Sequence, residues 1–213
     1  MRAWREMFTD FLADRPGQAP YTDDDYFRYV DGKPRYDGVR SFLQSRGIEL
    51  PDGGGAEETS LRTVSGLGNL KDALFGQVLS TDGVEAYPGS VALLDYLAER
   101  PVVLAVVSSS RNAPGVLQAA GLADRFAFVV DGKVASDAGL PGKPAPDTFL
   151  YAAEKAGAAP AACVVIEDAV SGVAAARAGG FGLVIGVDRG AGADALRAAG
   201  ADLVVSDLNE LIA

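Results

Sequence analysis

Histidine is absent from this sequence of 213 residues, and cysteine occurs once. Without histidine, the chain lacks the base of Ser-His-Asp and Cys-His catalysis and the imidazole ligands of many zinc sites. A single cysteine excludes an internal disulfide, so we expect a reducing, cytoplasmic location. Cys163 opens an apolar run and is typical of a small buried residue. Carboxylates, lysine, arginine, hydroxyl groups and cations held by oxygen remain for chemistry.

Long hydrophobic runs are also missing, because no stretch approaches the ~20 apolar residues that span a bilayer. The opening letters MRAWREMFTDF contain no signal-peptide core, since Arg5, Glu6 and Asp10 interrupt them. The formal net charge of −10 argues against nucleic acid and anionic membranes as partners. Apolar residues make up 48% and charged residues 23%, which indicates an ordinary globular protein. We expect a monomer that acts on a small molecule.

The part of the chain from residue 81 to residue 213 alternates short apolar runs with helical segments. Helical patterns closed by glycine separate the runs. This alternation predicts an α/β fold, with a Rossmann-like parallel sheet covered by helices on both faces. The predicted strands are 102–107, 126–130, 163–166, 181–187 and 202–205.

Residues 1–80 have a different pattern and predict an all-helical domain. Trp4, Met7, Phe8 and Phe11 follow the i, i+3, i+4, i+7 spacing of an amphipathic helix. Residues 51–58 (PDGGGAEE) predict a polar loop between two later helices. The α/β domain then follows as 81–213, and its first helix is expected to begin at Pro88. The further predicted helices of the first domain are 23–32, 35–47 and 61–79.

Polar residues follow the predicted strands. In an open parallel sheet, ligands bind beyond the carboxyl ends of the strands, so these residues are expected to gather around one crevice. After the fourth strand, Asp188 and Arg189 predict a turn with a surface ion pair. The candidates after the other strands are Ser108, Ser109, Ser110, Arg111 and Asn112, then Lys143, and finally Glu167 and Asp168.

Each candidate has a simpler structural explanation. The serines could turn the chain and cap a helix, and Lys143 could be a surface lysine held between Gly142 and Pro144. Asp168 could be an N-cap, which leaves the neighbouring Glu167 unexplained. Two adjacent carboxylates near a sheet edge are costly unless positive charge lies beside them. A phosphorylated ligand with Mg²⁺ accounts for the whole group.

In that hypothesis, Glu167 and Asp168 supply carboxylate oxygens to Mg²⁺. Ser108 and nearby backbone amides hold phosphate oxygens. Lys143 neutralises the charge that builds up on the transferred group.

These motifs resemble those of the haloacid dehalogenase-like superfamily of phosphatases and phosphomutases. VVSSSRN resembles its Ser/Thr motif, GKPAPD its lysine motif and VVIEDAVSGVAAARAGG its acidic metal motif, in the same order. The nearest group is β-phosphoglucomutase-like, with a helical cap over an α/β core. By this resemblance, Ser109, Ser110, Arg111 and Asn112 lie near the substrate. Arg35, in VDGKPRYDG, grips a distal phosphate and Lys71 faces the site, although both could also be exposed helix charges.

One family motif has no counterpart in the chain. The family begins with a strand ending in Asp-x-Asp, whose first aspartate attacks phosphorus. We expect that missing strand to lie between 102–107 and 163–166 of the sheet. The sequence thus predicts Mg²⁺-dependent phosphoryl transfer on a small phosphorylated metabolite, such as a sugar phosphate, through an aspartyl-phosphate formed outside these residues.

Two alternatives remain open. One is a non-catalytic module that binds Mg²⁺ and a phosphorylated ligand, or a protein partner. The other is a halide-releasing dehalogenase, which needs no metal and leaves the paired acids unexplained.

Overall fold

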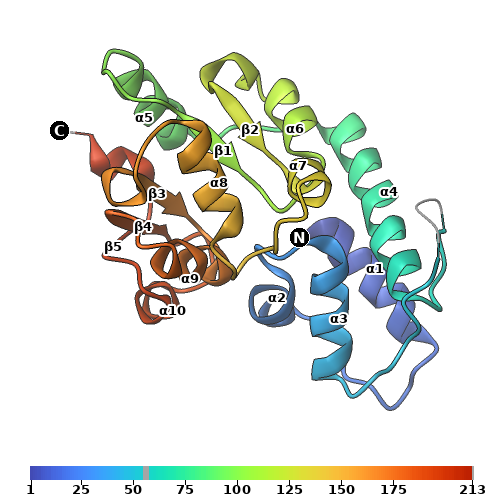
Figure 1. Ribbon diagram of the computed structural model, residues 1–213. Helices are drawn as coiled ribbons and strands as arrows, with labels where there is room; N and C mark the ends of the chain where they lie inside the picture. Colours follow the sequence, from blue (N-terminus) through green and yellow to red (C-terminus); the bar gives the residue numbers. More distant parts are fainter. Residues whose placement is uncertain (55–57, 213) are drawn as a thin grey trace. The chain divides into compact units, whose positions relative to one another are not determined.

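The computed structural model describes residues 1–54 and 58–212. Contacts divide the chain into two compact units, Met1–Gly83 and Val84–Ala213, and each is considered by itself (Figure 1). The predicted loop 51–58 falls partly outside the described residues. None of the helices in the described ranges combines the length and the apolar character that crossing a membrane requires.

The first unit is helical. The sequence predicted one helix over 23–32, whereas the structure has a short α-helix followed by one π-helical segment. The α-helix begins with a capping box between Thr22 and Asp25, and Gly32 follows the π-helical segment with a positive φ of 71°. The elements are α1 (Arg2–Ala13), α2 (Asp23–Asp25), η1 (Tyr26–Val30), α3 (Arg35–Ser45) and α4 (Val64–Asp82).

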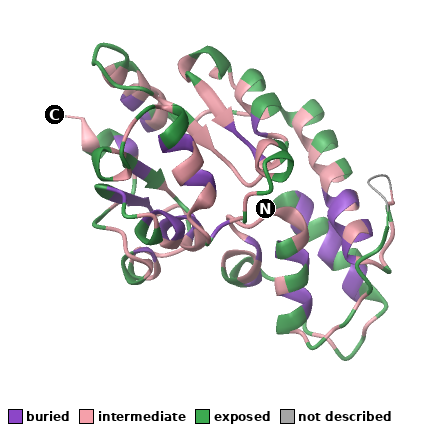
Figure 2. Ribbon diagram, viewed as in Figure 1, coloured by how far each residue is buried: buried purple, intermediate pink, exposed green. Residues whose placement is uncertain are grey.

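An aromatic cluster forms the core of the first unit. Helix α1 turns Trp4, Met7, Phe8 and Phe11 inward, as its spacing predicted, and each is buried. The Phe8 ring lies 4.0 Å from the ring of Phe42 on α3, measured between centroids. Helix α4 packs against both α1 and α3, and Figure 2 shows buried residues along these helices. The unit closes around this cluster.

The second unit alternates helices and strands. Asp131 accepts hydrogen bonds from the amides of Lys133 and Val134, and this cap starts a helix, α7, that the predicted elements did not include. The helices are α5 (Pro88–Ala98), α6 (Ala113–Ala119), α7 (Gly132–Asp137), α8 (Asp147–Lys155), α9 (Val170–Ala178) and α10 (Ala193–Ala199), with 3₁₀ turns η2 (Ala123–Arg125), η3 (Pro160–Ala162) and η4 (Leu208–Leu211). The strands are β1 (Ala105–Val107), β2 (Phe128–Val130), β3 (Val164–Glu167), β4 (Leu183–Val187) and β5 (Leu203–Val205).

All of the strand pairs in the described residues are parallel, as predicted, but they form two sheets instead of one. The first sheet has the order β1-β2 and the second the order β3-β4-β5. Val106 pairs with Val129 in the first sheet, and Val165 pairs with Val184 in the second. No ladder joins β1 to β3 within the described ranges. Each of these two strands therefore has one edge without a backbone partner there.

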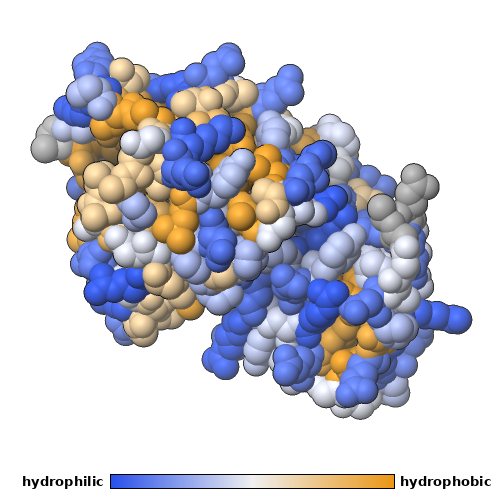
Figure 3. All heavy atoms as spheres, viewed as in Figure 1, coloured by the Kyte–Doolittle hydropathy of each residue, from blue (hydrophilic) through white to orange (hydrophobic). Residues whose placement is uncertain are grey.

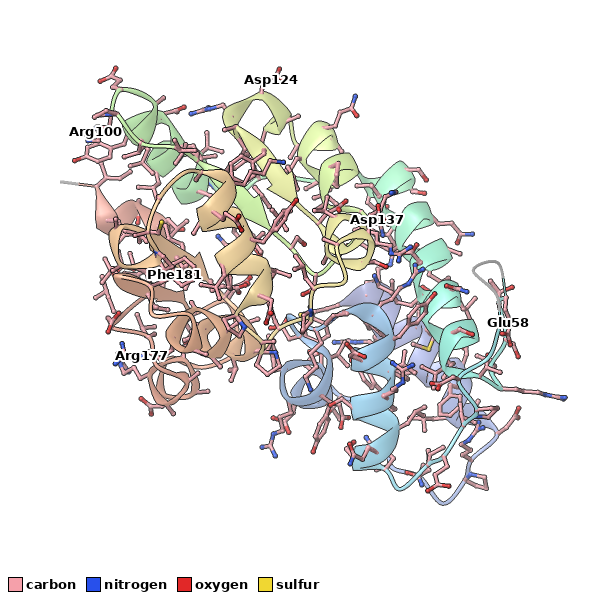
Figure 4. All side chains as sticks on the ribbon, in the orientation of Figure 1. Glu58, Arg100, Asp124, Asp137, Arg177 and Phe181 are labelled. Atoms are coloured by element: carbon pink, nitrogen blue, oxygen red, sulfur yellow. The ribbon has the colours of Figure 1, made fainter. Side chains whose placement is uncertain are left out.

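Apolar clusters lie against both faces of the three-stranded sheet. On one face, Val165 and Val184 pack with α8, α9 and α10 through a cluster that includes Phe149 and Phe181. The rings of Phe149 and Phe181 meet edge to face at 5.9 Å, and Figure 4 labels Phe181. On the other face, Ile185 packs with α5 and η4. These helices hold the carboxyl ends of the strands in place.

Several large apolar residues of the second unit remain exposed. Val103 is 60% exposed just before β1, and Val164 is 56% exposed at the start of β3. Ile166, also on β3, is 37% exposed, so the apolar side chains on one face of this strand are only partly covered. In Figure 3, hydrophobic atoms reach the surface in the upper-left part of the view, where α5 lies in Figure 1. Val103, Val164 and Ile166 thus lie on or next to β1 and β3, each of which has an unpaired edge within the described ranges.

Candidate active site

Lys143 occupies the centre of the candidate site. Its side chain is 4% exposed and forms an ion pair with Glu167, which directly ends β3. The same ammonium group donates a hydrogen bond of 3.3 Å to the carbonyl of Val107, the last residue of β1. Lys143 Nζ also lies 4.6 Å from the ring centroid of Phe149. One side chain therefore connects the carboxyl ends of the two sheets.

The Glu167 carboxylate is held from several directions. Besides Lys143, it accepts hydrogen bonds from the backbone amides of Asp168 at 3.0 Å and Ala169 at 3.1 Å, just ahead of α9. The sequence predicts a divalent cation against both acids. In the structure the positive partner of Glu167 is Lys143, and a buried pair of this kind requires such additional hydrogen bonds to offset its desolvation.

Asp168 has a different environment. Its surface is exposed, yet the surrounding protein removes enough water to raise the pKa of the Asp168 carboxyl, and the charge of Glu167 raises it further. Arg189 and Lys143 act in the opposite direction. The exposed surface of Asp168 leaves its carboxylate accessible to an ion. Asp168 is therefore the more available of the two acids.

The donor set at this point fits a hard cation in part. Asp168 offers an exposed carboxylate, which is the ligand type that Mg²⁺ prefers. Within the described ranges, no group of three His, Cys, Asp or Glu side chains is arranged to hold a metal ion. Any Mg²⁺ bound here would need further oxygen ligands from phosphate, water or a segment outside these residues.

The serine loop follows β1 at the same end of the sheet. The Ser108 amide donates a hydrogen bond to the carbonyl of Val130. The Ser108 hydroxyl accepts a hydrogen bond of 3.2 Å from the amide of Ser110. The Ser110 hydroxyl in turn accepts from the amide of Asn112, which precedes α6. These bonds turn the chain, as the structural explanation predicts, but the cap that it also predicts is not seen, since the N-cap of α6 is Asn112 and has no side-chain cap bond. They also place Ser108 directly after Val107, whose carbonyl binds Lys143.

The other predicted substrate contacts of the second unit lie near this loop in sequence. Ser109 follows Ser108 directly, and a Cβ on Gly132 would lie 2.6 Å from the Ser109 carbonyl oxygen. The Arg111 guanidinium donates a bond of 3.2 Å to Ser136 at the surface. The structure thus holds the loop close to the start of α7.

Arg35 and Lys71 belong to the first unit. Arg35 pairs with Asp72 at 2.7 Å and donates to the Tyr36 hydroxyl at 3.1 Å. Lys71 is 9% exposed, and its ammonium lies near the rings of Trp4 and Phe75. Burial lowers the pKa of the Lys71 ammonium. Neither residue is an exposed helix charge, which corrects the alternative explanation for both.

The turn after β4 also differs from its prediction. Asp188 does not pair with Arg189 in the described structure; its carboxylate accepts from the amides of Gly190 at 3.1 Å and Gly192 at 3.0 Å. Arg189 instead donates to the Ser90 hydroxyl at 2.9 Å and lies over the ring of Tyr87. The sequence held no periodic signal for this contact, because the partners are far apart along the chain.

Comparison with known proteins agrees with this fold. The sequence profile described as haloacid dehalogenase-like hydrolase matches residues 1–180. The chain belongs to this family. A protein named Beta-phosphoglucomutase, from Mycobacterium bovis (strain ATCC BAA-935 / AF2122/97), is 47% identical over 99% of this chain and 84% of its own length.

Two further proteins extend the comparison. Hexitol phosphatase A of Escherichia coli (strain K12) is 31% identical over 99% of this chain and 84% of its own length. The crystal structure of beta-phosphoglucomutase (pgmB) from Clostridium difficile matches with a TM-score of 0.77 at 20% identity, covering 99% of this chain and 86% of the other. The last comparison shows the fold.

Proposed function

We propose that this protein catalyses Mg²⁺-dependent phosphoryl transfer on a small phosphorylated metabolite, such as a sugar phosphate. The observation that carries the proposal is the buried Lys143 ammonium, held between Val107 at the end of β1 and Glu167 at the end of β3. A fixed positive charge at that point would stabilise the negative charge of a transferring phosphoryl group. The relatives named β-phosphoglucomutase and hexitol phosphatase support a sugar or sugar-alcohol phosphate as substrate.

The nucleophile in this proposal is an aspartate carried by a strand outside these 213 residues. The unpaired edges of β1 and β3 and the exposed apolar side chains Val103, Val164 and Ile166 support a parallel strand between the two sheets. Such a strand would bring its carboxyl end beside Lys143. Its aspartate oxygen would attack phosphorus, the P–O bond to the leaving group would break, and an aspartyl-phosphate would form.

The remaining side chains take separate roles. Mg²⁺ would neutralise phosphate charge, with Asp168 as a carboxylate ligand. The Ser108 hydroxyl would donate to a phosphate oxygen, and Lys143 would contact the transferring group. Ser109, Ser110, Arg111 and Asn112 are proposed to contact the rest of the substrate, as are Arg35 and Lys71 of the first unit. Water or a second substrate hydroxyl would then accept the phosphoryl group.

The experiment compares the 213-residue chain with a version that carries an apolar strand ending in Asp-x-Asp ahead of Met1. Both are assayed with Mg²⁺, a generic phosphomonoester and β-glucose 1-phosphate. We expect turnover in the extended protein and a loss on the order of a hundredfold in its Lys143→Met variant. Turnover that is unchanged by Lys143→Met would contradict the assignment.

A non-catalytic module remains the second candidate, because no third metal-ligating acid accompanies Glu167 and Asp168 in the described ranges. Calorimetry with Mg²⁺ and inorganic phosphate separates the two. Metal-dependent phosphate binding without turnover, in both versions of the chain, would favour the module. Arg35→Ala in the extended protein tests the distal grip: it should weaken a sugar bisphosphate more than a monophosphate.

A further inference from the structure

Gly172 lies on α9 directly beside the Glu167 carboxylate. A Cβ at this position would lie 2.6 Å from Oε2 of Glu167 and closer still to its Cδ and Oε1. These three atoms are the nearest ones that such a Cβ would meet, and all belong to one carboxyl group. The space at Gly172 is therefore space for the Glu167 carboxylate.

That carboxylate has a defined position on its other sides. It accepts from the amides of Asp168 and Ala169 and pairs with the Lys143 ammonium. The side chains of Glu167 and Lys143 are 9% and 4% exposed, so water contributes little to holding either of them. We call this arrangement, the two amides with Gly172 behind the carboxylate, the Glu167 seat.

Two glycines on other helices have open space at the same point, whereas Gly89 on α5 lies against the carboxylate of Asp207. A Cβ on Gly115 of α6, or on Gly76 of α4, would meet no heavy atom within 4 Å. Replacing either with alanine is expected to favour the helix, because glycine loses more backbone freedom on folding. Gly172 would share this gain, so a helix with glycine at this position is less stable than it could be. At Gly172, unlike Gly76 and Gly115, the adjacent Glu167 carboxylate gives a local reason for the missing side chain.

We propose that Gly172 is a positioning residue that fixes Lys143 through Glu167. A side chain at position 172 would push the carboxylate off the two amides and away from the ammonium. The carboxylate is the end of a flexible side chain, so the fold can absorb this movement. Lys143 would lose its fixed partner while the helix and sheet remained. The geometry of the Glu167 seat does not depend on the proposed function. Only its role, which is to position Lys143 for contact with a phosphoryl group, rests on that proposal.

The experiment measures the chemical reactivity of the Lys143 amine, which reports on whether Glu167 holds it, and it requires no turnover. Gly172→Ala and the control Gly115→Ala are each subjected to reductive methylation, and the rate at each lysine is followed by mass spectrometry. Lys133, whose side chain is 68% exposed, provides the internal reference. We expect the relative rate at Lys143 to rise severalfold in Gly172→Ala and to stay unchanged in Gly115→Ala. A folded Gly172→Ala protein with the original rate at Lys143 would overturn the proposal.

A second pair of variants keeps the test decisive. Glu167→Asp draws the carboxylate back by one methylene and leaves room for a Cβ. Adding Gly172→Ala to Glu167→Asp should then change the Lys143 rate no further, whereas additive increases would refute the seat. If Gly172→Ala alone fails to fold, the double variant should fold; an unfolded double variant would show that the Cβ clashes with something else.

Phosphate binding separates this inference from the proposed function. In calorimetry with Mg²⁺ and inorganic phosphate, Gly172→Ala should weaken binding severalfold and Gly115→Ala should not. A raised labelling rate with unchanged phosphate affinity would leave the seat intact and count against the catalytic role of Lys143. An unchanged labelling rate would refute the seat, whatever the phosphate affinity.

Discussion

The two units of this chain differ in how completely they bury their large apolar side chains. The helical unit Met1–Gly83 gathers its aromatic residues into one buried cluster, in which Phe8, Phe11 and Phe42 are fully covered. The α/β unit Val84–Ala213 has smaller clusters on two faces of a sheet, and it leaves Val103 and Val164 more than half exposed. The first unit closes on itself, whereas the second presents open strand edges.

The buried ion pairs of the two units also differ in where they lie. In the first unit, Arg46 and Asp25 pair at 2.8 Å beside the capping box of α2, where they tie loops together. In the second, Lys143 and Glu167 pair at the carboxyl ends of two strands, where parallel sheets bind ligands. An ion pair inside a closed unit serves stability, while one at an open sheet end is placed to meet a substrate. Four tests address this contrast, in order of decreasing expected effect.

The largest effect is expected from Phe8→Ala in the helical unit. Losing this fully buried ring should cost about 3–5 kcal/mol of that unit's stability. Trp4, the single tryptophan of the chain, reports on this unit by fluorescence during urea unfolding. Leu196→Ala, at an equally buried site on α10, should leave the Trp4 midpoint unchanged. If both variants move that midpoint alike, the two units unfold together and the contrast fails.

The next test compares Lys143→Met with Arg46→Met. Each leaves a largely buried carboxylate without its cation, so each should lower the free energy of unfolding by about 3 kcal/mol. Only Lys143→Met should abolish Mg²⁺-dependent binding of inorganic phosphate in calorimetry. Equal losses of phosphate binding in the two folded variants would remove the functional distinction between the pairs.

Val164→Thr examines the open edge. In the 213-residue chain, this residue is 56% exposed, and the substitution should change stability by less than about 0.5 kcal/mol. In the version extended by a strand, the side chain should become covered, and the hydroxyl should cost about 1–3 kcal/mol. Chemical denaturation of both versions measures the difference. The same small cost in both would show that the added strand does not cover β3.

The smallest effect is expected from Asp168→Asn without metal. The pKa of Asp168 is raised above its ordinary value of 3.8, so the folded state binds the proton more tightly than the unfolded state. The stability of the wild type therefore falls as pH rises from about 3.8 through the raised pKa, and the amide removes this loss. Because the side chain is exposed, the gain at pH 7 should be about 0.5 kcal/mol or less.

Thermal unfolding in the presence of a chelator, at pH 7 and at pH 3, tests the direction of this effect. Asp168→Asn should be more stable than the wild type at pH 7 and not at pH 3. Added Mg²⁺ should then stabilise the wild type and not the variant. An Asn variant that is less stable than the wild type at pH 7 without metal would contradict the expected direction.

Much of the fold could be predicted from the sequence, because apolar runs and glycine-closed helices follow local rules. The amphipathic stripe of α1 and the five strands are examples. Strand limits were less accurate: the run 102–107 begins with residues that lie outside β1, since a ladder requires a partner as well as apolar character. Helix α7 was missed because it depends on the Asp131 cap more than on hydrophobic spacing.

The candidate site was predicted in outline, since topology brings strand ends together. The partners of individual charges were not predictable. Glu167 meets Lys143, which is 24 residues away, and lies against Gly172, which is set by the approach of α9 to β3. Arg189 contacts Ser90 across 99 residues. Such pairings depend on packing in three dimensions, which no spacing rule in the sequence specifies.

The bridge made by Lys143 has a consequence for cooperativity. In the described strands, a side chain and no backbone ladder links β1 to β3, so the amide protons of the two sheets can open to solvent in separate events. Hydrogen exchange should therefore resolve two foldons within Val84–Ala213. A strand inserted along both edges would merge them, and slow exchange would then spread across all of the strands together.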